Sequence, residues 1–249
     1  MIKWEKTSQV WGITGNLGGG KTLSGVCMAV DALERGWFVV TNVELDYDAL
    51  SARLGYDSRQ MVRQVDMDDD DPMTWPAGSP RGSGGKKRVV VLLDEVAEWF
   101  DQYSSTSQKV KGFLSWLRHT SKRSQDVVLI VQRKEYLAKS LRILVARWVW
   151  CEDLAVWRIP VLKIHLPFCG GLVMRTVHDR IGNVLQTMDT IRKREYGRYY
   201  STAQCLVSGA GEAEEYGTPL VRRDTSDPLA LLEAAAAIAG LVAVAIAAA

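Results

Sequence analysis

An eight-residue glycine-rich segment near the start of the chain limits what the protein can fold into. Residues 15–22 read Gly-Asn-Leu-Gly-Gly-Gly-Lys-Thr, which satisfies the pattern G-x-x-x-x-G-K-[ST] at every fixed position. A short apolar stretch, 10–14, precedes this segment, and residues 23–35 follow it with apolar side chains at helical spacing. The order of strand, glycine loop and helix predicts an α/β fold built around a phosphate-binding loop.

The residue types of this loop suit the binding of a nucleoside triphosphate. The glycines let backbone N–H groups curl around phosphate, and the helix N-terminus adds partial positive charge. Lys21 is expected to reach the β- and γ-phosphates, and Thr22 to bind Mg²⁺. We therefore predict ATP and Mg²⁺ as cofactors. The predicted nucleotide-binding residues are Gly15, Asn16, Leu17, Gly18, Gly19, Gly20, Lys21 and Thr22.

A pair of carboxylates follows a second apolar stretch. Five consecutive apolar residues, 89–93, lead into Asp94 and Glu95, as in a doubly buried parallel strand that ends at the ligand edge of its sheet. Hydrolysis of a nucleotide uses one carboxylate near Mg²⁺ and another to polarise the attacking water. We assign Asp94 to the metal and Glu95 to the water.

Further segments extend the predicted sheet. Gln132 ends an apolar run and is expected to contact the γ-phosphate or the attacking water, or else to be a buried residue that caps a strand. Strands are predicted at 37–43, 126–132, 147–151, 161–166 and 172–177, with the start of a hairpin at 154–157. Helices are predicted at 47–54, 58–65, 110–122 and 136–145. The predicted fold class is a parallel β-sheet P-loop NTPase core flanked by helices.

The charge is unevenly distributed although the net charge is only +2. Between Lys109 and Arg147, ten Lys and Arg residues stand against Asp126 and Glu135, a net charge of +8. Such a surface suits an anionic partner such as DNA, and a solvated basic face is the alternative. The four cysteines are scattered with no C-x-x-C pair, which argues against a zinc site and against a disulfide framework.

The sequence predicts three parts. Residues 1–207 form an ATPase domain with a mobile acidic and Gly/Pro-rich loop at 66–85, and residues 208–228 form a polar linker. Residues 229–249 are alanine-rich and apolar, with Glu233 as their one charged residue. We predict a single membrane helix there, although it barely reaches the ~20 residues that a span needs. The alternatives are an alanine-rich helix packed in the protein and a ragged tail.

The order of these motifs resembles the zonula occludens toxin (Zot)-like ATPases, which include the assembly ATPase of filamentous phages. This group belongs to the DNA-pumping and secretion P-loop ATPases. Besides the phosphate loop, Asp94-Glu95 and the strand before Gln132, the matching pieces are Val39-Val40-Thr41-Asn42, Leu117-Arg118-His119 and Tyr196-Gly197-Arg198-Tyr199-Tyr200-Ser201. The resemblance spans roughly residues 9–201.

The resemblance implies a ring of identical subunits with ATP at the interfaces. In such rings an arginine from the neighbour stabilises charge on the γ-phosphate, and Arg118 and Arg123 are the candidates here. The implied function is a motor that couples Mg-ATP hydrolysis to virion or DNA export. The implied partners are other phage assembly proteins and single-stranded DNA. The implied location is the host inner membrane, with the ATPase domain held in the cytoplasm by Arg222 and Arg223.

Other functions are compatible with the same motifs. A genome-packaging ATPase of a membrane-containing phage would carry the same loop and the same Asp-Glu pair. A small-molecule kinase would need a substrate pocket, and Glu95 as a water-activating base favours hydrolysis over transfer. A nucleotide-gated, membrane-anchored assembly scaffold would bind ATP without turnover. The presence of Lys21, Thr22, Asp94 and Glu95 argues against this alternative.

Overall fold

The computed structural model describes residues 4, 8–79, 88–101, 103, 107–154 and 171–201, without the side chains of 186–189. The backbone divides into two units, Met1–Gln204 and Cys205–Ala249, and every described residue belongs to the first. The predicted linker 208–228, the predicted membrane helix 229–249 and the strand at 161–166 lie outside the described residues. Within the described ranges, no helix is both long enough and apolar enough to cross a bilayer.

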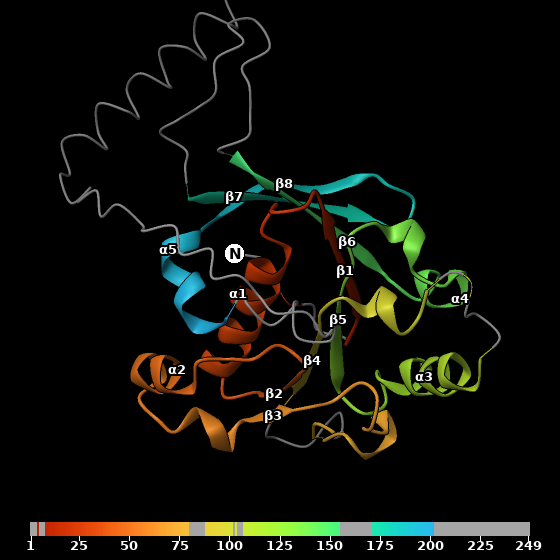
Figure 1. Ribbon diagram of the computed structural model, residues 1–249, viewed down its shortest axis with the longest axis horizontal. Helices are drawn as coiled ribbons and strands as arrows, with labels where there is room; N and C mark the ends of the chain where they lie inside the picture. The colour runs from red at the N-terminus through yellow and green to blue at the C-terminus, as the bar shows by residue number, and fades with distance from the viewer. Residues whose placement is uncertain are drawn as a thin grey trace, which may run out of the picture. The chain divides into compact units, whose positions relative to one another are not determined.

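The first unit contains a mostly parallel sheet with the strand order β3-β2-β4-β5-β1-β6-β7-β8 (Figure 1). Neighbouring strands from β3 to β6 pair in parallel, whereas β6, β7 and β8 pair antiparallel. The prediction of an α/β fold with a parallel sheet is therefore confirmed from β3 to β6, whereas β7 and β8 are added antiparallel. The strands are β1 (Val10–Gly15), β2 (Phe38–Thr41), β3 (Val62–Gln64), β4 (Val89–Leu93), β5 (Gln125–Ile130), β6 (Arg147–Asp153), β7 (Leu172–Asp179) and β8 (Val184–Arg192).

Helices cover both faces of the parallel strands (Figure 1). In β4, Val90 and Leu92 enter a core shared with α1, whereas Val89, Val91 and Leu93 enter a second core shared with α3. Burial on both faces explains why these strands read as continuous apolar runs rather than as alternating patterns. The helices are α1 (Lys21–Glu34), α2 (Tyr47–Leu54), α3 (Gln108–His119), α4 (Lys139–Arg142) and α5 (Lys193–Tyr196).

Helix α1 lies close against the middle of the sheet. A Cβ atom on Gly25 would lie 2.6 Å from Ile130 Cδ1 and 2.7 Å from Leu92 Cδ1, so glycine is what lets the helix approach β4 and β5. The helix is almost wholly buried from Leu23 to Leu33. This packing holds the first turn of α1, which carries Lys21 and Thr22, at the carboxyl ends of the strands.

Two predicted helices differ from the structure because pairing with other segments overrides local preference. Residues 58–65 form a short 3₁₀ turn and then β3, in which Val62 pairs with Val39 of β2. Residues 136–145 contain only the short α4, because Leu137 forms a bridge with Asp101 and keeps the chain extended there. The helix at 47–54 is confirmed.

The described part of the acidic and Gly/Pro-rich segment, residues 66–79, packs on the core. Met67 and Trp75 are buried, and the ring centroids of Trp75 and Trp116 lie 5.0 Å apart. The Arg123 guanidinium donates to the carbonyls of Met73 at 3.1 Å and Trp75 at 2.5 Å. Two buried apolar side chains and these bonds therefore anchor residues 66–79.

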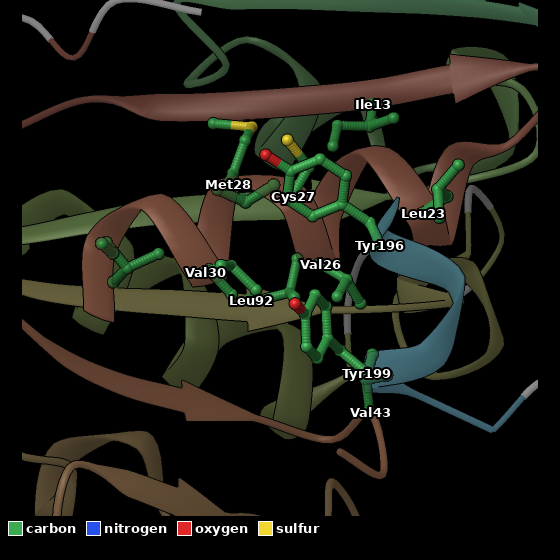
Figure 2. Close-up of a cluster of buried hydrophobic side chains, with 14 of the residues drawn as sticks. Ile13, Leu23, Val26, Cys27, Met28, Val30, Val43, Leu92, Tyr196 and Tyr199 are labelled. Carbon is green, nitrogen blue, oxygen red and sulfur yellow. The ribbon is translucent and has the colours of Figure 1, made fainter. Parts of the chain in front are cut away.

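After β8 the chain returns to α1 and to the loop that follows β2. Tyr196 and Tyr199 pack against α1 beside Cys27 and Val26 (Figure 2). The backbone N–H of Asp46 donates to the carbonyl of Tyr199 at 2.8 Å, and Leu45 and Tyr200 form an isolated antiparallel bridge. The segment Tyr199–Ser201 is thereby fixed beside the carboxyl end of β2.

Candidate nucleotide-binding site

The glycine-rich loop joins β1 to α1 in a conformation that other residues could not adopt without strain. Gly20 has a φ of 84°, in the left-handed region, and a Cβ atom on it would lie 2.4 Å from Val173 Cγ2. A Cβ on Gly15, whose φ is 154°, would lie 2.2 Å from the carbonyl oxygen of Cys151. Strands β6 and β7 therefore pack directly against the loop, and two of its glycines are required by that contact.

Lys21 and Thr22 begin α1 and face different partners. Lys21 Nζ donates to the carbonyls of Asn16 at 2.9 Å and Gly15 at 3.2 Å, so the side chain folds back over the loop. Thr22 Oγ1 donates to Asp94 Oδ2 at 2.5 Å. Leu17 is exposed at the tip of the loop. The loop and the carboxylate at the end of β4 thus belong to one site.

Asp94 accepts hydrogen bonds at both carboxylate oxygens. Oδ2 accepts from Thr22, and Oδ1 accepts from the backbone N–H of Glu95 at 2.8 Å. Burial raises the pKa of Asp94, while these two bonds and the charge of Lys21 act in the opposite direction. In this arrangement the Asp94 carboxylate is a hydrogen-bond acceptor, and its charge repels other negatively charged groups nearby.

The donor set suits a small hard cation that also binds phosphate. A hydroxyl and a carboxylate oxygen 2.5 Å apart are ligands that Mg²⁺ accepts, and Mg²⁺ usually takes its other ligands from water and nucleotide phosphates. Among the residues that the structure describes, no group of three or more His, Cys, Asp and Glu could hold a metal. Thr22 and Asp94 would therefore supply only part of the coordination of Mg²⁺.

Glu95 has a strained backbone beside this site. Its φ of 52° and ψ of 37° place it in the left-handed region, which a non-glycine residue occupies at a cost of about 1–3 kcal/mol. Glu98 follows one 3₁₀ turn later, and burial, a hydrogen bond with Glu95 and the charge of Asp94 raise its pKa. Three carboxyl groups therefore lie close together after β4.

Gln132 lies two residues beyond the end of β5, the strand between β1 and β4. Its carbonyl accepts from Thr14 Oγ1 at 3.0 Å, which ties this turn to the residue before the phosphate loop. Gln132 is exposed rather than buried under a strand end. The strand order thus places it between the loop and Asp94-Glu95.

Arg118 and Arg123 lie near the amino ends of the parallel strands, whereas the phosphate loop lies at their carboxyl ends. Both precede the amino end of β5, which is paired in parallel with β1, whereas the phosphate loop follows the carboxyl end of β1. Neither side chain can therefore reach the loop of its own chain. Arg118 is exposed on the last turn of α3, while the guanidinium of Arg123 binds the two carbonyls described above.

Several basic side chains of the segment 109–147 form contacts within the chain. Lys109 pairs with Asp68 at 2.7 Å, and Arg147 lies over the ring of Trp11 at 5.4 Å. Asp126 is buried and pairs with Arg88 at 3.2 Å. Besides Lys109, the exposed basic residues of the segment are Lys111, Arg118, Lys122, Arg133, Lys134 and Lys139.

Asn42 is a site residue to which sequence reasoning gave no role. Its side chain makes two hydrogen bonds to the main chain of Asp94, at 2.8 and 3.0 Å. A polar residue directly after a buried strand was the available signal, because the carboxyl ends of parallel strands share one edge. In the sequence, the Thr41-Asn42 pair carries only part of a family resemblance.

Comparison with known families shows where this chain belongs. The family model described as zonular occludens toxin (Zot) matches residues 10–205, which is most of the chain. The chain belongs to the Zot family. The resemblance drawn from the motifs is thereby confirmed.

Relatives of this Zot-family chain include proteins of phages. The Gene 1 protein of Escherichia phage If1 is 28% identical over 166 residues, which cover 66% of this chain and 45% of that protein. The Gene 1 protein of Enterobacteria phage M13 is 28% identical over 167 residues, covering 66% of this chain and 45% of that protein. The chain therefore spans less than half the length of these relatives.

The solved structures that this chain resembles have low sequence identity to it. The N-terminal domain of zonular occludens toxin from Neisseria meningitidis is 18% identical with a TM-score of 0.48, covering 78% of this chain and 100% of that one. The genome packaging NTPase B204 from Sulfolobus turreted icosahedral virus 2, solved with ATP-gammaS, is 14% identical with a TM-score of 0.43, covering 74% and 97%.

Proposed function

We propose that this Zot-family chain is the ATP-hydrolysing subunit of a phage assembly motor, which couples Mg-ATP hydrolysis to virion or DNA export. The observation that carries the proposal is the 2.5 Å contact between Thr22 and Asp94, 72 residues apart in sequence. This contact unites a phosphate-binding loop with the carboxylates that hydrolysis would use. The relatives named Gene 1 protein support a role in phages.

The phosphates would bind to the loop and to Lys21. The backbone N–H groups of residues 15–20 and the N-terminus of α1 supply partial positive charge, and Lys21 supplies a full charge that can move from the loop carbonyls onto phosphate. Thr22 and Asp94 would hold Mg²⁺, whose chemistry is to neutralise charge on the β- and γ-phosphates.

Glu95 would act on the attacking water. Its left-handed backbone turns the chain away from β4 immediately after Asp94, so the two neighbouring carboxylates can serve different partners. Glu95 would orient the water and accept its proton, a role that contributes about 10²–10⁴ in rate. Gln132, exposed at the end of the intervening strand, would contact the γ-phosphate or the same water.

The coupling to export would involve other subunits and DNA. A ring of identical subunits would let Arg118 act at a neighbour's site, since it cannot reach its own, and Arg123 stays a second candidate for this role. The exposed basic residues between 109 and 147 would bind single-stranded DNA through salt-sensitive contacts.

We further propose that residues 229–249 anchor the motor at the host inner membrane beside other assembly proteins, with the ATPase domain in the cytoplasm.

The test is Mg²⁺-dependent ATP hydrolysis by the full chain, measured alone, with single-stranded DNA and with duplex DNA at two salt concentrations. The proposal predicts turnover that single-stranded DNA increases and that salt reduces, and no turnover in Lys21→Ala. Stimulation by duplex DNA alone would instead indicate a packaging motor. Nucleotide binding without turnover under every condition would indicate a nucleotide-gated scaffold and would overturn the proposal.

A further inference from the structure

Asn42 occupies the position where the pairing of β2 with β4 ends. The last backbone pair of this ladder joins Thr41 to Leu92. Beyond it, the Asn42 side chain takes over: Nδ2 donates to the carbonyl of Asp94 at 3.0 Å, and Oδ1 accepts from the N–H of Asp94 at 2.8 Å. A side-chain amide carries one donor group and one acceptor, so it can replace a peptide group of a neighbouring strand.

The two bonds restrain the main chain of Asp94 at both its N–H and its carbonyl. The carboxylate of the same residue is held by Thr22 and by the N–H of Glu95. The position of the carboxylate depends on the backbone that carries it, because β4 ends at Leu93 and no longer supports the next residue. Asn42 supplies that missing support.

Asn42 is itself held in place by the segment behind it. Thr41 Oγ1 accepts from the N–H of Val43 at 3.0 Å, and both residues are buried. Val43 packs beside Tyr199 (Figure 2), and the Asp46 N–H donates to the carbonyl of Tyr199 at 2.8 Å. The turn after β2 is therefore fixed independently of any contact that Asn42 makes with Asp94.

We propose that Asn42 is a positioning residue: its two hydrogen bonds to the main chain of Asp94 hold the carboxylate where it meets Thr22 and Mg²⁺. The inference rests on the proposed function only in assuming that Mg-nucleotide binds at this site. It assigns Asn42 no contact with the reacting atoms.

The test measures binding rather than turnover. A fluorescent ATP analogue is titrated onto the full-length chain without divalent ions, and Mg²⁺ is then titrated into the complex. In Asn42→Leu and Asn42→Ser, the Mg²⁺ concentration for half-saturation rises about 10-fold, the effect expected when a group that orients a metal ligand is lost. Affinity for the analogue without Mg²⁺ stays unchanged, because the phosphate loop is intact.

Asp46→Ala is the matched control on the same turn. Asp46 caps α2 by accepting from the N–H groups of Asp48 and Ala49, so its loss loosens the turn without touching Asp94. Asp46→Ala lowers the thermal midpoint and leaves the Mg²⁺ half-saturation unchanged. Unchanged Mg²⁺ half-saturation in both Asn42 variants, or an equal shift in Asp46→Ala, would overturn the inference. If the chain binds Mg-nucleotide but does not hydrolyse it, the proposed motor function is wrong. The Mg²⁺ titration would still test the role of Asn42, because it measures binding and not hydrolysis.

Discussion

At the scale of single residues, the glycines of the phosphate loop are not equivalent. Gly18 and Gly20 both have left-handed φ angles, 70° and 84°. A Cβ on Gly18 would meet nothing within 4 Å, whereas a Cβ on Gly20 would lie 2.4 Å from Val173 Cγ2. The same substitution at the two positions therefore adds backbone strain at both and a steric clash at only one.

We predict that Gly20→Ala destabilises the fold by about 1–3 kcal/mol more than Gly18→Ala, the usual cost of overpacking a filled site. Urea denaturation of the two variants measures the difference. Replacing Val173 with Ala in the Gly20→Ala background should recover part of the loss. Equal stability of the two single variants would show that contact with β7 does not restrict the loop.

Asp126 gives a prediction about pH. Its carboxyl is buried, accepts from the N–H of Gln9 at 2.9 Å and pairs with Arg88. Burial raises the pKa of Asp126 to about 6, above the ordinary value for an aspartate, although Gln9 and Arg88 oppose the shift. The folded state therefore binds a proton more tightly than the unfolded state does, and stability rises as pH falls through about 6 towards 4.

Over this pH interval Asp126 contributes at most about 3 kcal/mol to the free energy of unfolding, because one pKa unit corresponds to about 1.36 kcal/mol. Asp126→Asn should remove this part of the pH dependence, as measured by urea denaturation at a series of pH values. Subtracting the two curves separates Asp126 from Asp94 and Glu98, whose pKa values are also raised. Parallel curves for the two proteins between pH 4 and about 7 would contradict the assignment.

At the scale of secondary-structure elements, Arg123 is one of the side chains that hold the segment 66–79 in place. Arg123 holds the carbonyls of Met73 and Trp75, and its own carbonyl accepts from the N–H of Gly78 at 2.8 Å. The segment is thereby fixed over Trp116 of α3. Arg123 thus has a structural role in its own chain.

We predict that Arg123→Ala destabilises the fold by about 2 kcal/mol, since two carbonyls lose a charged donor. Lys122→Ala, an exposed neighbour of the same charge, is the control and should change stability little. Thermal and urea denaturation measure both. An Arg123→Ala protein of unaltered stability that loses turnover only in the oligomer would instead support a role for Arg123 at a neighbour's site.

Most of the elements that position the site could be predicted from the sequence. The contacts that support them from neighbouring segments could not. Glycine spacing and an apolar run before two carboxylates were enough to place Lys21, Thr22 and Asp94, because local pattern and strand ends determine these positions. The role of Asn42 depends on β2 lying next to β4, which no local pattern encodes. The anchoring of Trp75 by Arg123 likewise depends on residues 48 positions apart.

At the scale of the whole molecule, the proposed ring gives a prediction about mixed subunits. If Arg118 acts on a neighbour's nucleotide, Arg118→Ala should lose at least about 10³-fold in turnover in the oligomer. Lys21→Ala should also be inactive, but it keeps Arg118. Mixing the two inactive proteins should restore part of the activity, because some sites then combine an intact loop with an intact arginine. Mixtures as inactive as their components would argue against Arg118 acting between subunits.

We propose that Glu95 activates water at a site where Thr22 and Asp94 hold Mg-ATP. The most direct measurement compares nucleotide binding and ATP hydrolysis in the full chain and in Glu95→Gln. We expect equal binding of a fluorescent ATP analogue and at least about a 10²-fold loss of turnover in the variant. Turnover that survives in Glu95→Gln would show that Glu95 is not the base, and a full chain that binds no nucleotide would show that this is not a nucleotide site.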